Sequence, residues 1–346
     1  MHDGMYIVDG DGHVFDWIDQ CYKQYLPAEY GSRSSYWPGW PWDRNQAGQG
    51  GQMGRSPSGP QDHLADNDAE GIDLAILYPT FGLYLGEIRE TDYQIALCRA
   101  YNDWVADYCK ADPDRLKPVA MVPVRDPTEA CREMNRAVAD LGHVGVMFPT
   151  FIRGRNVAEE FYWPIYGEAE KLGVPIGMHA SGSETSEVGR FETFLGVHTW
   201  SHVPEQLISV TSIVYGGILE VFQNLRIAFL ESGCGWAPFW IEHMQGEWES
   251  RRHDAPLCKE GPQHYLTCGR VYYSCEPEEK TIPYVAQWVG EDQLLYASDY
   301  PHFDSEWPNT VRILAGRDDL SASLKRKILG ENALRFYGLK TAVPTS

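Results

Sequence analysis

Eight short apolar runs, spread along the whole 346-residue chain, constrain the fold more than any other feature of the sequence. Each run is almost continuously apolar and is followed by Pro, Gly, His, Glu or Asp. Such runs are typical of strands that are buried on both faces of a parallel sheet. The runs are 6–8, 74–78, 118–122, 144–148, 175–178, 226–230, 271–274 and 294–297.

Amphipathic stretches separate these runs and predict helices. The predicted helices are 92–109, 127–141, 159–172, 204–222, 236–249, 277–289 and 322–337. Because strand and helix patterns alternate, and because no Gly-x-Gly-x-x-Gly motif follows a strand, the sequence favours a (β/α)8 TIM barrel over a doubly wound sheet. We see no linker long enough to separate a second domain, and expect residues 1–346 to form one barrel domain.

One segment departs from this alternation. Residues 30–60, after the first predicted strand, are rich in Trp, Gly, Ser and Pro and show neither a helical nor a strand period. Disordered segments are poor in aromatic residues, so we interpret this segment as an inserted loop that covers a pocket or docks against another subunit. A disordered insert is the alternative. Trp40 is the residue of this loop that we expect to contact a substrate.

The composition limits the class of partner. A formal net charge of −20 opposes binding to nucleic acid and to anionic lipid, although a small anionic substrate remains compatible with it. Eight cysteines form no Cys-x-x-Cys pair, which favours reduced thiols in a cytoplasmic protein. We expect no signal peptide, because no basic region precedes an apolar core near residue 1. The apolar window 207–222 contains Ser, Thr, Gly and Glu and predicts a buried helix.

Ionisable residues stand at the ends of five of the apolar runs. In a (β/α)8 barrel, chemistry gathers at the C-terminal ends of the strands, and ionisable groups are costly inside core strands. We therefore expect these residues at the mouth of the barrel. They are Asp11 with His13, then His179, Glu231, Glu276 and Asp299.

Four of these residues form a reasonable ligand set for a divalent metal. Asp11 and His13 are two positions apart on a strand, so their side chains point to the same side. With His179 and Asp299 they combine imidazole and carboxylate ligands, which suit Zn, Mn or Fe. An ion with an open position activates water near neutral pH. For His179 alone, a core histidine bonded to backbone is the alternative.

A second ion has a candidate site nearby. His198 and His202 are four residues apart, which places both imidazoles on one face of a helix. Together with Glu231 they would hold a second metal, and paired ions are a common catalytic device. The alternative is that His198 and His202 form a polar helix face or contact the substrate. The expected cofactor is therefore one or two divalent ions.

Several motifs resemble the amidohydrolase superfamily, in the branch that contains aminocarboxymuconate semialdehyde decarboxylase. The motifs are the Asp-x-His of the first strand, Met178-His179, residues 230–236 and residues 298–302. The resemblance covers nearly the whole chain. It implies a (β/α)8 barrel that holds one or two divalent metals, in a family of hydrolases, hydratases and non-oxidative decarboxylases.

The resemblance also implies roles for individual residues. Asp11 and His13 match the ligands of strand one, with Asp11 in place of the commoner histidine. His179 matches the ligand of strand five, and Asp299 matches the strand-eight carboxylate, which binds metal and moves a proton. The departure is Glu231, which stands where the decarboxylase has a histidine; a glutamate there would act as a general base or as a ligand of a second metal.

These observations predict a metal-dependent hydrolase or carboxy-lyase that acts on a small, carboxylated molecule. We expect Asp299, Glu231 and His202 to take part in catalysis. Arg153 is placed to clamp a substrate carboxylate, or else is surface charge. His302 is expected to contact the substrate or to support the metal site, and the alternative is a loop histidine. Two alternatives are a dinuclear oxygenase that hydroxylates a small molecule, and a non-catalytic barrel subunit. We expect a homo-oligomer or a pair with a paralogous subunit.

Overall fold

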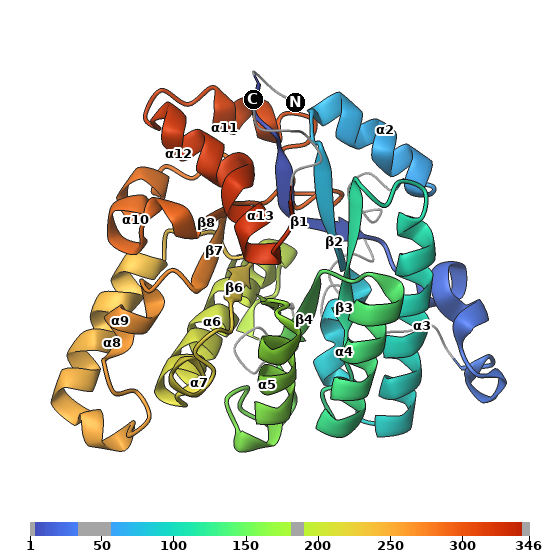
Figure 1. Cartoon of the computed structure of the whole chain (residues 1–346), viewed down its shortest axis with the longest axis horizontal. Helices are drawn as coiled ribbons and strands as arrows, with labels where there is room; N and C mark the ends of the chain where they lie inside the picture. Colours follow the sequence, from blue (N-terminus) through green and yellow to red (C-terminus); the bar gives the residue numbers. More distant parts are fainter. Residues whose placement is uncertain (1–3, 34–56, 181–189, 341–346) are drawn as a thin grey trace.

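The computed structural model describes residues 4–33, 57–180 and 190–340, and its centre is a parallel barrel ringed by helices (Figure 1). The 8-stranded sheet has its strands in chain order, so each strand pairs with the next one along the sequence. This arrangement confirms the predicted TIM barrel. The strands are β1 (Val8–Val14), β2 (Leu74–Pro79), β3 (Leu116–Met121), β4 (Gly145–Pro149), β5 (Ile176–His179), β6 (Ile227–Leu230), β7 (Val271–Cys275) and β8 (Leu294–Tyr296).

The first strand contains the Asp-x-His motif, as predicted. We expected a strand that includes the apolar run 6–8 and ends in this motif, and β1 begins at Val8 and runs through the motif to Val14. Asp and Gly have low strand propensity, so the apolar run alone marks only the start of this strand. Its pairing with β2 shifts register between Asp9 and Gly12. All seven residues of β1 are buried.

Hydrogen bonds between β1 and the segment after β8 close the barrel. His13 N–H donates to the carbonyl of Tyr300 over 2.7 Å, and Asp299 N–H donates to the carbonyl of Asp11 over 3.2 Å. Below them, Ser298 donates both its N–H (3.0 Å) and its hydroxyl (2.5 Å) to the carboxylate of Asp9. These bonds join the first strand to the segment that follows the last strand, at and next to the residues predicted to bind metal.

The helices lie outside the barrel, as the apolar faces of the amphipathic stretches require. They are α2 (Pro60–Glu70), α3 (Thr91–Cys109), α4 (Pro127–Leu141), α5 (Trp163–Leu172), α6 (Phe194–Tyr215), α7 (Ile218–Val221), α8 (Ala237–Arg251), α9 (Pro262–Leu266), α10 (Ile282–Val289), α11 (Thr310–Ala315), α12 (Ala322–Arg326) and α13 (Asn332–Tyr337). Short 3₁₀ or π turns are η1 (Ile18–Tyr22), η2 (Lys23–Tyr25), η3 (Ala28–Tyr30), η4 (Phe81–Glu87), η5 (Glu160–Tyr162), η7 (Arg252–Asp254), η8 (Glu291–Gln293) and η9 (Lys327–Glu331).

The predicted helix 127–141 matches α4 at both ends. At α4, the Asp126 carboxylate accepts from the N–H groups of Thr128 and Glu129, and Gly142 ends the helix in a left-handed conformation. By contrast, the predicted helix 204–222 starts too late, since α6 begins at Phe194 and carries Pro204 in its interior. The predicted helix 277–289 begins only at Ile282, and the predicted helix 322–337 is divided into α12, η9 and α13.

The tryptophan-rich segment falls mostly outside the described residues. Residues 34–56, which include Trp40, are not described, so the loop and its substrate contact remain predictions. Within the described residues, no helix has the length and apolarity needed to cross a membrane. The eight cysteines of the chain are free thiols.

Candidate metal centre

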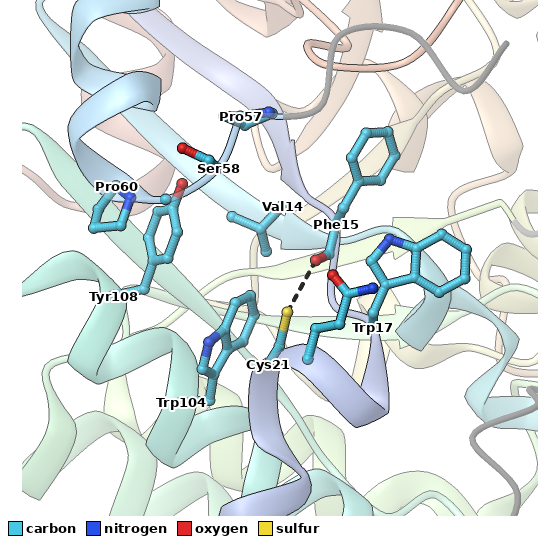
Figure 2. Close-up of a pocket in the computed structure, with 11 residues that line it drawn as sticks. Val14, Phe15, Trp17, Cys21, Pro57, Ser58, Pro60, Trp104 and Tyr108 are labelled. Carbon is cyan, nitrogen blue, oxygen red and sulfur yellow. Dashed lines mark hydrogen bonds between the residues drawn. The ribbon is translucent and has the colours of Figure 1, made fainter.

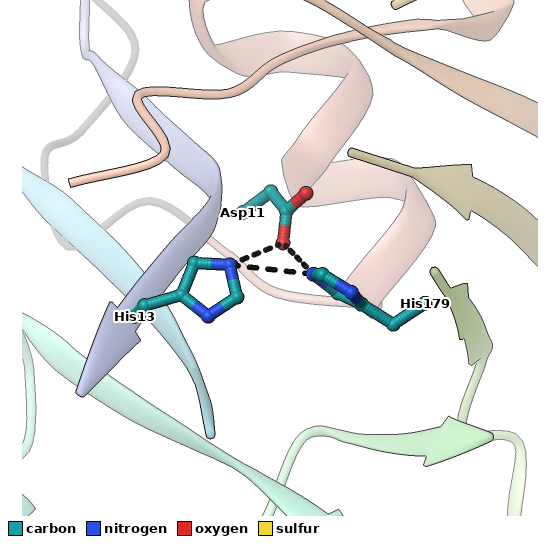
Figure 3. A group of neighbouring side chains, drawn as sticks. All are labelled: Asp11, His13 and His179. Carbon is teal, nitrogen blue, oxygen red and sulfur yellow. Dashed lines mark hydrogen bonds and ion pairs between the residues drawn. The ribbon is translucent and has the colours of Figure 1, made fainter. Parts of the chain in front are cut away.

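Three buried side chains from two strands across the barrel meet at its mouth (Figure 3). Asp11 and His13 come from β1, and His179 comes from the end of β5. Asp11 Oδ1 lies 3.3 Å from His179 Nε2 and 3.7 Å from His13 Nε2. The structure therefore brings together three of the four ligands predicted from the sequence, as a group whose ligand atoms lie within 4.8 Å of one another.

The backbone sets the orientation of both imidazoles. His13 Nδ1 lies 3.0 Å from the carbonyl of Pro79, and His179 Nδ1 lies 3.0 Å from the carbonyl of Ala180. A carbonyl oxygen only accepts hydrogen bonds, so each Nδ1 carries a proton and donates. In the neutral rings the lone pairs are then on the two Nε2 atoms, which are 3.3 Å apart. Such an oriented pair of imidazoles is the usual support of a metal ligand set.

The electrostatics of this cluster favour a bound cation. Burial lowers the pKa of His179, but the carboxylates of Asp11 and Glu231 outweigh it and raise the value to about 9. Burial and the imidazoles of His302 and His179 hold the pKa of His13 well below its usual value. Asp11 Oδ1 is buried and, within the described chain, accepts no hydrogen bond of ordinary geometry. Two imidazole nitrogens and a buried carboxylate oxygen fit a divalent metal.

Asp299 and His302 form the adjoining part of the site. Asp299 Oδ1 lies 3.6 Å from His13 Nε2 and 2.6 Å from His302 Nδ1. His302 Nε2 is in turn 3.0 Å from the hydroxyl of Thr80, at the end of β2. His13, Asp299 and His302 make a second group of close ligand atoms that shares His13 with the first. His302 therefore supports Asp299 from the side of β2.

Glu231 and Asp299 share an uncommon backbone conformation. Their φ angles are 54° and 53°, in the left-handed region, and no other described non-glycine residue has a positive φ. Glu231 N–H donates to the hydroxyl of Ser274 over 3.1 Å, and Asp299 N–H donates to the carbonyl of Asp11. Strain of this kind costs about 1–2 kcal/mol per residue and is common at functional sites.

The residues predicted for a second metal divide into two pairs. His202 Nε2 lies 3.3 Å from Glu231 Oε1, while His198 Nε2 lies 3.2 Å from Asp304 Oδ2. Glu231 Oε2 also lies 3.2 Å from His179 Nδ1, so this carboxylate connects His202 with the first site. Asp304 was missed from the sequence; its place two residues after His302 in the loop that follows β8 was the available signal. The second metal remains a prediction.

The predicted substrate clamp, Arg153, has a partner of its own. Its Nε and Nη2 atoms both donate to Glu87 Oε2, with the Nε bond at 2.8 Å and the Nη2 bond at 2.5 Å. Arg153 N–H also donates to the carbonyl of Gly86. Two of its guanidinium nitrogens are thus engaged by a buried carboxylate, and its contact with a substrate remains a prediction.

A cavity of about 540 Å³ lies beside the end of β1 (Figure 2). Val14 and Phe15 border it from β1 and the residue that follows, and Trp104 and Tyr108 border it from α3. The thiol of Cys21 donates to the carbonyl of Phe15 over 3.2 Å, while the Phe15 ring lies 6.1 Å from the His302 ring. Phe15 therefore separates this cavity from the carboxylate and imidazole cluster.

Comparisons with known proteins agree on one family. The amidohydrolase family model matches residues 8–339. The chain is 22% identical over 285 residues to 2-amino-3-carboxymuconate-6-semialdehyde decarboxylase of Dictyostelium discoideum, covering 81% of this chain and 77% of that protein. It is 25% identical over 289 residues to gamma-resorcylate decarboxylase of Rhizobium sp. (strain MTP-10005), covering 80% of this chain and 86% of that protein.

Solved structures show the same fold. The crystal structure of 5-carboxyvanillate decarboxylase from Sphingomonas paucimobilis matches with a TM-score of 0.81 at 18% identity, over 97% of this chain and 100% of that one. The 5-carboxyvanillate decarboxylase of Novosphingobium aromaticivorans, complexed with manganese and 4-hydroxy-3-methoxy-5-nitrobenzoic acid, matches with a TM-score of 0.78 at 23% identity, over 98% of this chain and 97% of that one.

Proposed function

The chain belongs to the amidohydrolase family, and from this premise we propose that it is a metal-dependent carboxy-lyase that removes CO₂ from a small, conjugated or aromatic carboxylic acid. The observation that carries the proposal is the pair of Nε2 atoms of His13 and His179, 3.3 Å apart and beside Asp11. Relatives named as decarboxylases and solved decarboxylases of the same fold support decarboxylation over hydrolysis.

Asp11, His13, His179 and Asp299 would hold the metal, which is Mn, Zn or Fe. When bound, a divalent ion supplies Lewis-acid polarisation of a substrate oxygen and a positive charge that orients the carboxylate. The protein supplies the orientation of the ligands, because the carbonyls of Pro79 and Ala180 fix the two imidazoles. Manganese in a solved relative supports Mn as the first ion to test.

Decarboxylation requires a proton at the carbon that loses CO₂. The bond between that carbon and the carboxylate breaks, the electron pair stays on the carbon, and a proton replaces the departing CO₂. Asp299 is the group that delivers this proton, since it stands at the mouth of the barrel with His302 Nδ1 2.6 Å from its Oδ1. His302 orients the carboxyl group and is itself held by Thr80.

Glu231 acts on the site through two imidazoles. Its two oxygens lie within 3.3 Å of His179 Nδ1 and His202 Nε2, so it orients both rings from one carboxylate. Glu231 stands where the decarboxylase that this chain resembles has a histidine. In this arrangement His202 is the imidazole that contacts the substrate. We therefore assign Glu231 a role in positioning and His202 a role in substrate binding or proton transfer.

One metal fits the described residues better than two. The two groups of three close ligand atoms found in the described ranges both include His13. His198, which a second ion would need, lies 3.2 Å from Asp304 instead. This pairing favours the carboxy-lyase over the dinuclear oxygenase, and the cluster of oriented ligands favours an enzyme over a non-catalytic barrel.

The proposal is tested by CO₂ release. The purified chain is loaded with Mn and incubated with hydroxybenzoates that carry a carboxylate beside a hydroxyl, among them 2,6-dihydroxybenzoate and 5-carboxyvanillate. We expect CO₂ and the decarboxylated phenol in equal amounts, with loss of activity in the chelated protein and in His13→Gln. Oxygen consumption, or hydrolysis of a lactone or amide without CO₂ release, would contradict the carboxy-lyase and identify one of the alternatives.

A further inference from the structure

The η4 turn is capped by a carboxylate from the segment that follows β1. Thr80 stands at the N-cap position of this turn, directly after β2, but its hydroxyl makes no hydrogen bond to the turn. Asp16 accepts the N–H groups at the start of the turn instead. The N–H groups of Thr80 (2.9 Å) and Phe81 (2.6 Å) donate to Asp16 Oδ1, and that of Gly82 (3.0 Å) donates to Oδ2.

Asp16 caps the turn from a fully buried position. Its exposed fraction is 0%, and a buried carboxylate is costly unless hydrogen bonds stabilise it, which the three N–H groups do here. The turn is confined as well, since residues 81–87 are all buried. At its far end, Gln94 Nε2 donates to the carbonyl of Leu85 over 2.8 Å. Asp16 and Gln94 therefore hold the two ends of η4 in place.

The hydroxyl of Thr80 is bound to the metal centre. Thr80 Oγ1 lies 3.0 Å from His302 Nε2, and His302 Nδ1 lies 2.6 Å from Asp299 Oδ1. A threonine at an N-cap usually accepts a hydrogen bond from the backbone of its own turn. Asp16 accepts that bond from Gly82 here, so the Thr80 hydroxyl can contact His302 without leaving this N–H unpaired.

We propose that Asp16 is a positioning residue of the metal centre. It caps η4 so that the hydroxyl of Thr80 stays directed at His302, which in turn orients the proton donor Asp299. The role of Asp299 in this statement rests on the proposed function. The path from Asp16 to His302 does not, because its contacts are the same whatever reaction the site performs.

The neighbours of Asp16 pack along the same path. The ring of Trp17 lies 4.0 Å from that of Phe81, the first residue of η4. The ring of Phe15 lies 6.1 Å from that of His302. The segment that carries Asp16 is thus packed against both the turn that it caps and the histidine that the turn holds.

Asp16→Asn tests the role with little change in shape. An amide keeps one acceptor oxygen and replaces the other by a donor, which faces a backbone N–H. We expect the Thr80 hydroxyl to cap its own turn in this variant and to leave His302. In the Mn-loaded chain, kcat for CO₂ release should then fall by about three- to tenfold, while KM and the bound metal stay within about twofold of wild type.

Asp126→Asn is the matched control, because the Asp126 carboxylate also accepts two backbone N–H groups, but at the start of α4. Both substitutions should lower stability in urea, and only Asp16→Asn should lower kcat. In a chain that already carries Thr80→Val, Asp16→Asn should change kcat by less than about twofold, since the hydroxyl through which it acts is gone. An unchanged kcat in Asp16→Asn, or its full loss of kcat on top of Thr80→Val, would overturn the proposal.

Nitrogen-15 NMR of the Zn-loaded chain without substrate gives a readout that does not depend on the reaction. The Nε2 resonance of His302, identified by its absence in His302→Gln, should shift in Asp16→Asn and in the same direction in Thr80→Val. It should stay in place in Asp126→Asn. A resonance that Asp16→Asn leaves unshifted would overturn the proposal. If wild type released no CO₂ yet these shifts occurred, positioning of His302 by Asp16 would be supported and the proposed reaction contradicted.

The chain with Asp16 intact tests the same path if Asp16→Asn does not fold. In protein labelled with carbon-13 and nitrogen-15, the amide nitrogen of Phe81 should show scalar coupling to the carboxyl carbon of Asp16 through their hydrogen bond. Thr80→Val should preserve this coupling and shift the His302 resonance. Absence of the coupling, or an unshifted His302 in Thr80→Val, would contradict the path from Asp16 to the metal centre.

Discussion

His13 Nε2 and His179 Nε2 face one another across the barrel at 3.3 Å, one from β1 and the other from β5. Backbone carbonyls hold the opposite nitrogen of each ring, so both Nε2 atoms are directed at the same point. Two lone pairs so close together repel unless a proton or a cation lies between them. Asp11 Oδ1, 3.3 Å from His179 Nε2, adds negative charge at that point.

This geometry predicts that His13→Ala abolishes tight metal binding. Loss of one of two neutral nitrogen ligands should lower the metal retained after dialysis by more than about tenfold, and should reduce CO₂ release in step. The measurement is metal per chain by atomic emission. His243→Gln, which replaces an exposed histidine on α8, is the control and should retain wild-type metal. Full metal stoichiometry in His13→Ala would show that the site lies elsewhere.

The contact between His302 and Asp299 predicts a variant that binds metal but turns over slowly. His302→Gln removes the imidazole that lies 2.6 Å from Asp299 Oδ1, while Asp11, His13 and His179 are unchanged. We expect kcat to fall by about 10- to 100-fold with a smaller change in KM, because the proton donor loses its orientation.

Thr80→Val provides a graded comparison for the same contact. It removes the hydroxyl that lies 3.0 Å from His302 Nε2 and keeps the imidazole itself. Its kcat should fall less than that of His302→Gln. A loss of metal in His302→Gln, or an unchanged kcat, would be inconsistent with the role assigned to this histidine.

The left-handed backbone of Glu231 predicts an inverted order of stability between two substitutions. Glycine normally destabilises a protein relative to alanine, but at a φ of 54° alanine retains the steric strain that glycine lacks. Glu231→Gly should therefore be more stable than Glu231→Ala by about 1 kcal/mol in urea unfolding, although both lose the carboxylate.

The control is the same pair of substitutions at Glu29, which lies in the η3 turn and should show the usual order. An equal or lower stability of Glu231→Gly would indicate that the strain is relieved elsewhere.

The sequence predicts the barrel because burial on both faces gives each strand a continuous apolar run. It also predicts the cluster of Asp11, His13, His179 and Asp299, because each stands at the C-terminal end of such a run. The contacts that orient these residues connect positions far apart in the chain: His13 bonds to Pro79, and Asp9 to Ser298 across 289 positions. The period of the apolar residues within a helix or strand carries no information about contacts between positions so far apart in the sequence.

Two elements form against the local preference of their residues. The first strand runs through its Asp and Gly residues, which are poor strand formers, because their backbone groups pair with β2 and with the segment after β8. The start of α6 was missed because Pro204 is a common first residue of a helix. Here it lies within a helix that already began at Phe194. In both cases tertiary packing outweighs local preference.

Two buried histidines away from the metal centre predict how stability depends on pH. Burial lowers the pKa of His143 to about 3 and that of His63 to about 4, both well below the ordinary 6.5. The unfolded chain therefore takes up protons below pH 6.5 at positions where the folded chain does not. Stability that is fully present above pH 6.5 is lost as the pH falls, by up to about 1.4 kcal/mol per pH unit for each histidine.

His143→Gln isolates one of these contributions. Between pH 7.5 and pH 5, the free energy of unfolding of wild type should fall by about 2 kcal/mol more than that of the variant, because glutamine takes up no proton. The absolute stability of the variant at pH 7.5 should be lower, since the bond of His143 Nδ1 to the carbonyl of Ala137 (3.1 Å) is altered. The informative quantity is therefore the difference in the free energy of unfolding between the two pH values, measured by urea unfolding.

The control is His253→Gln, at a side chain 71% exposed, which should lose stability between these pH values just as wild type does. Equal losses in wild type and His143→Gln would mean that His143 is protonated in the folded chain, and that water reaches it despite its burial.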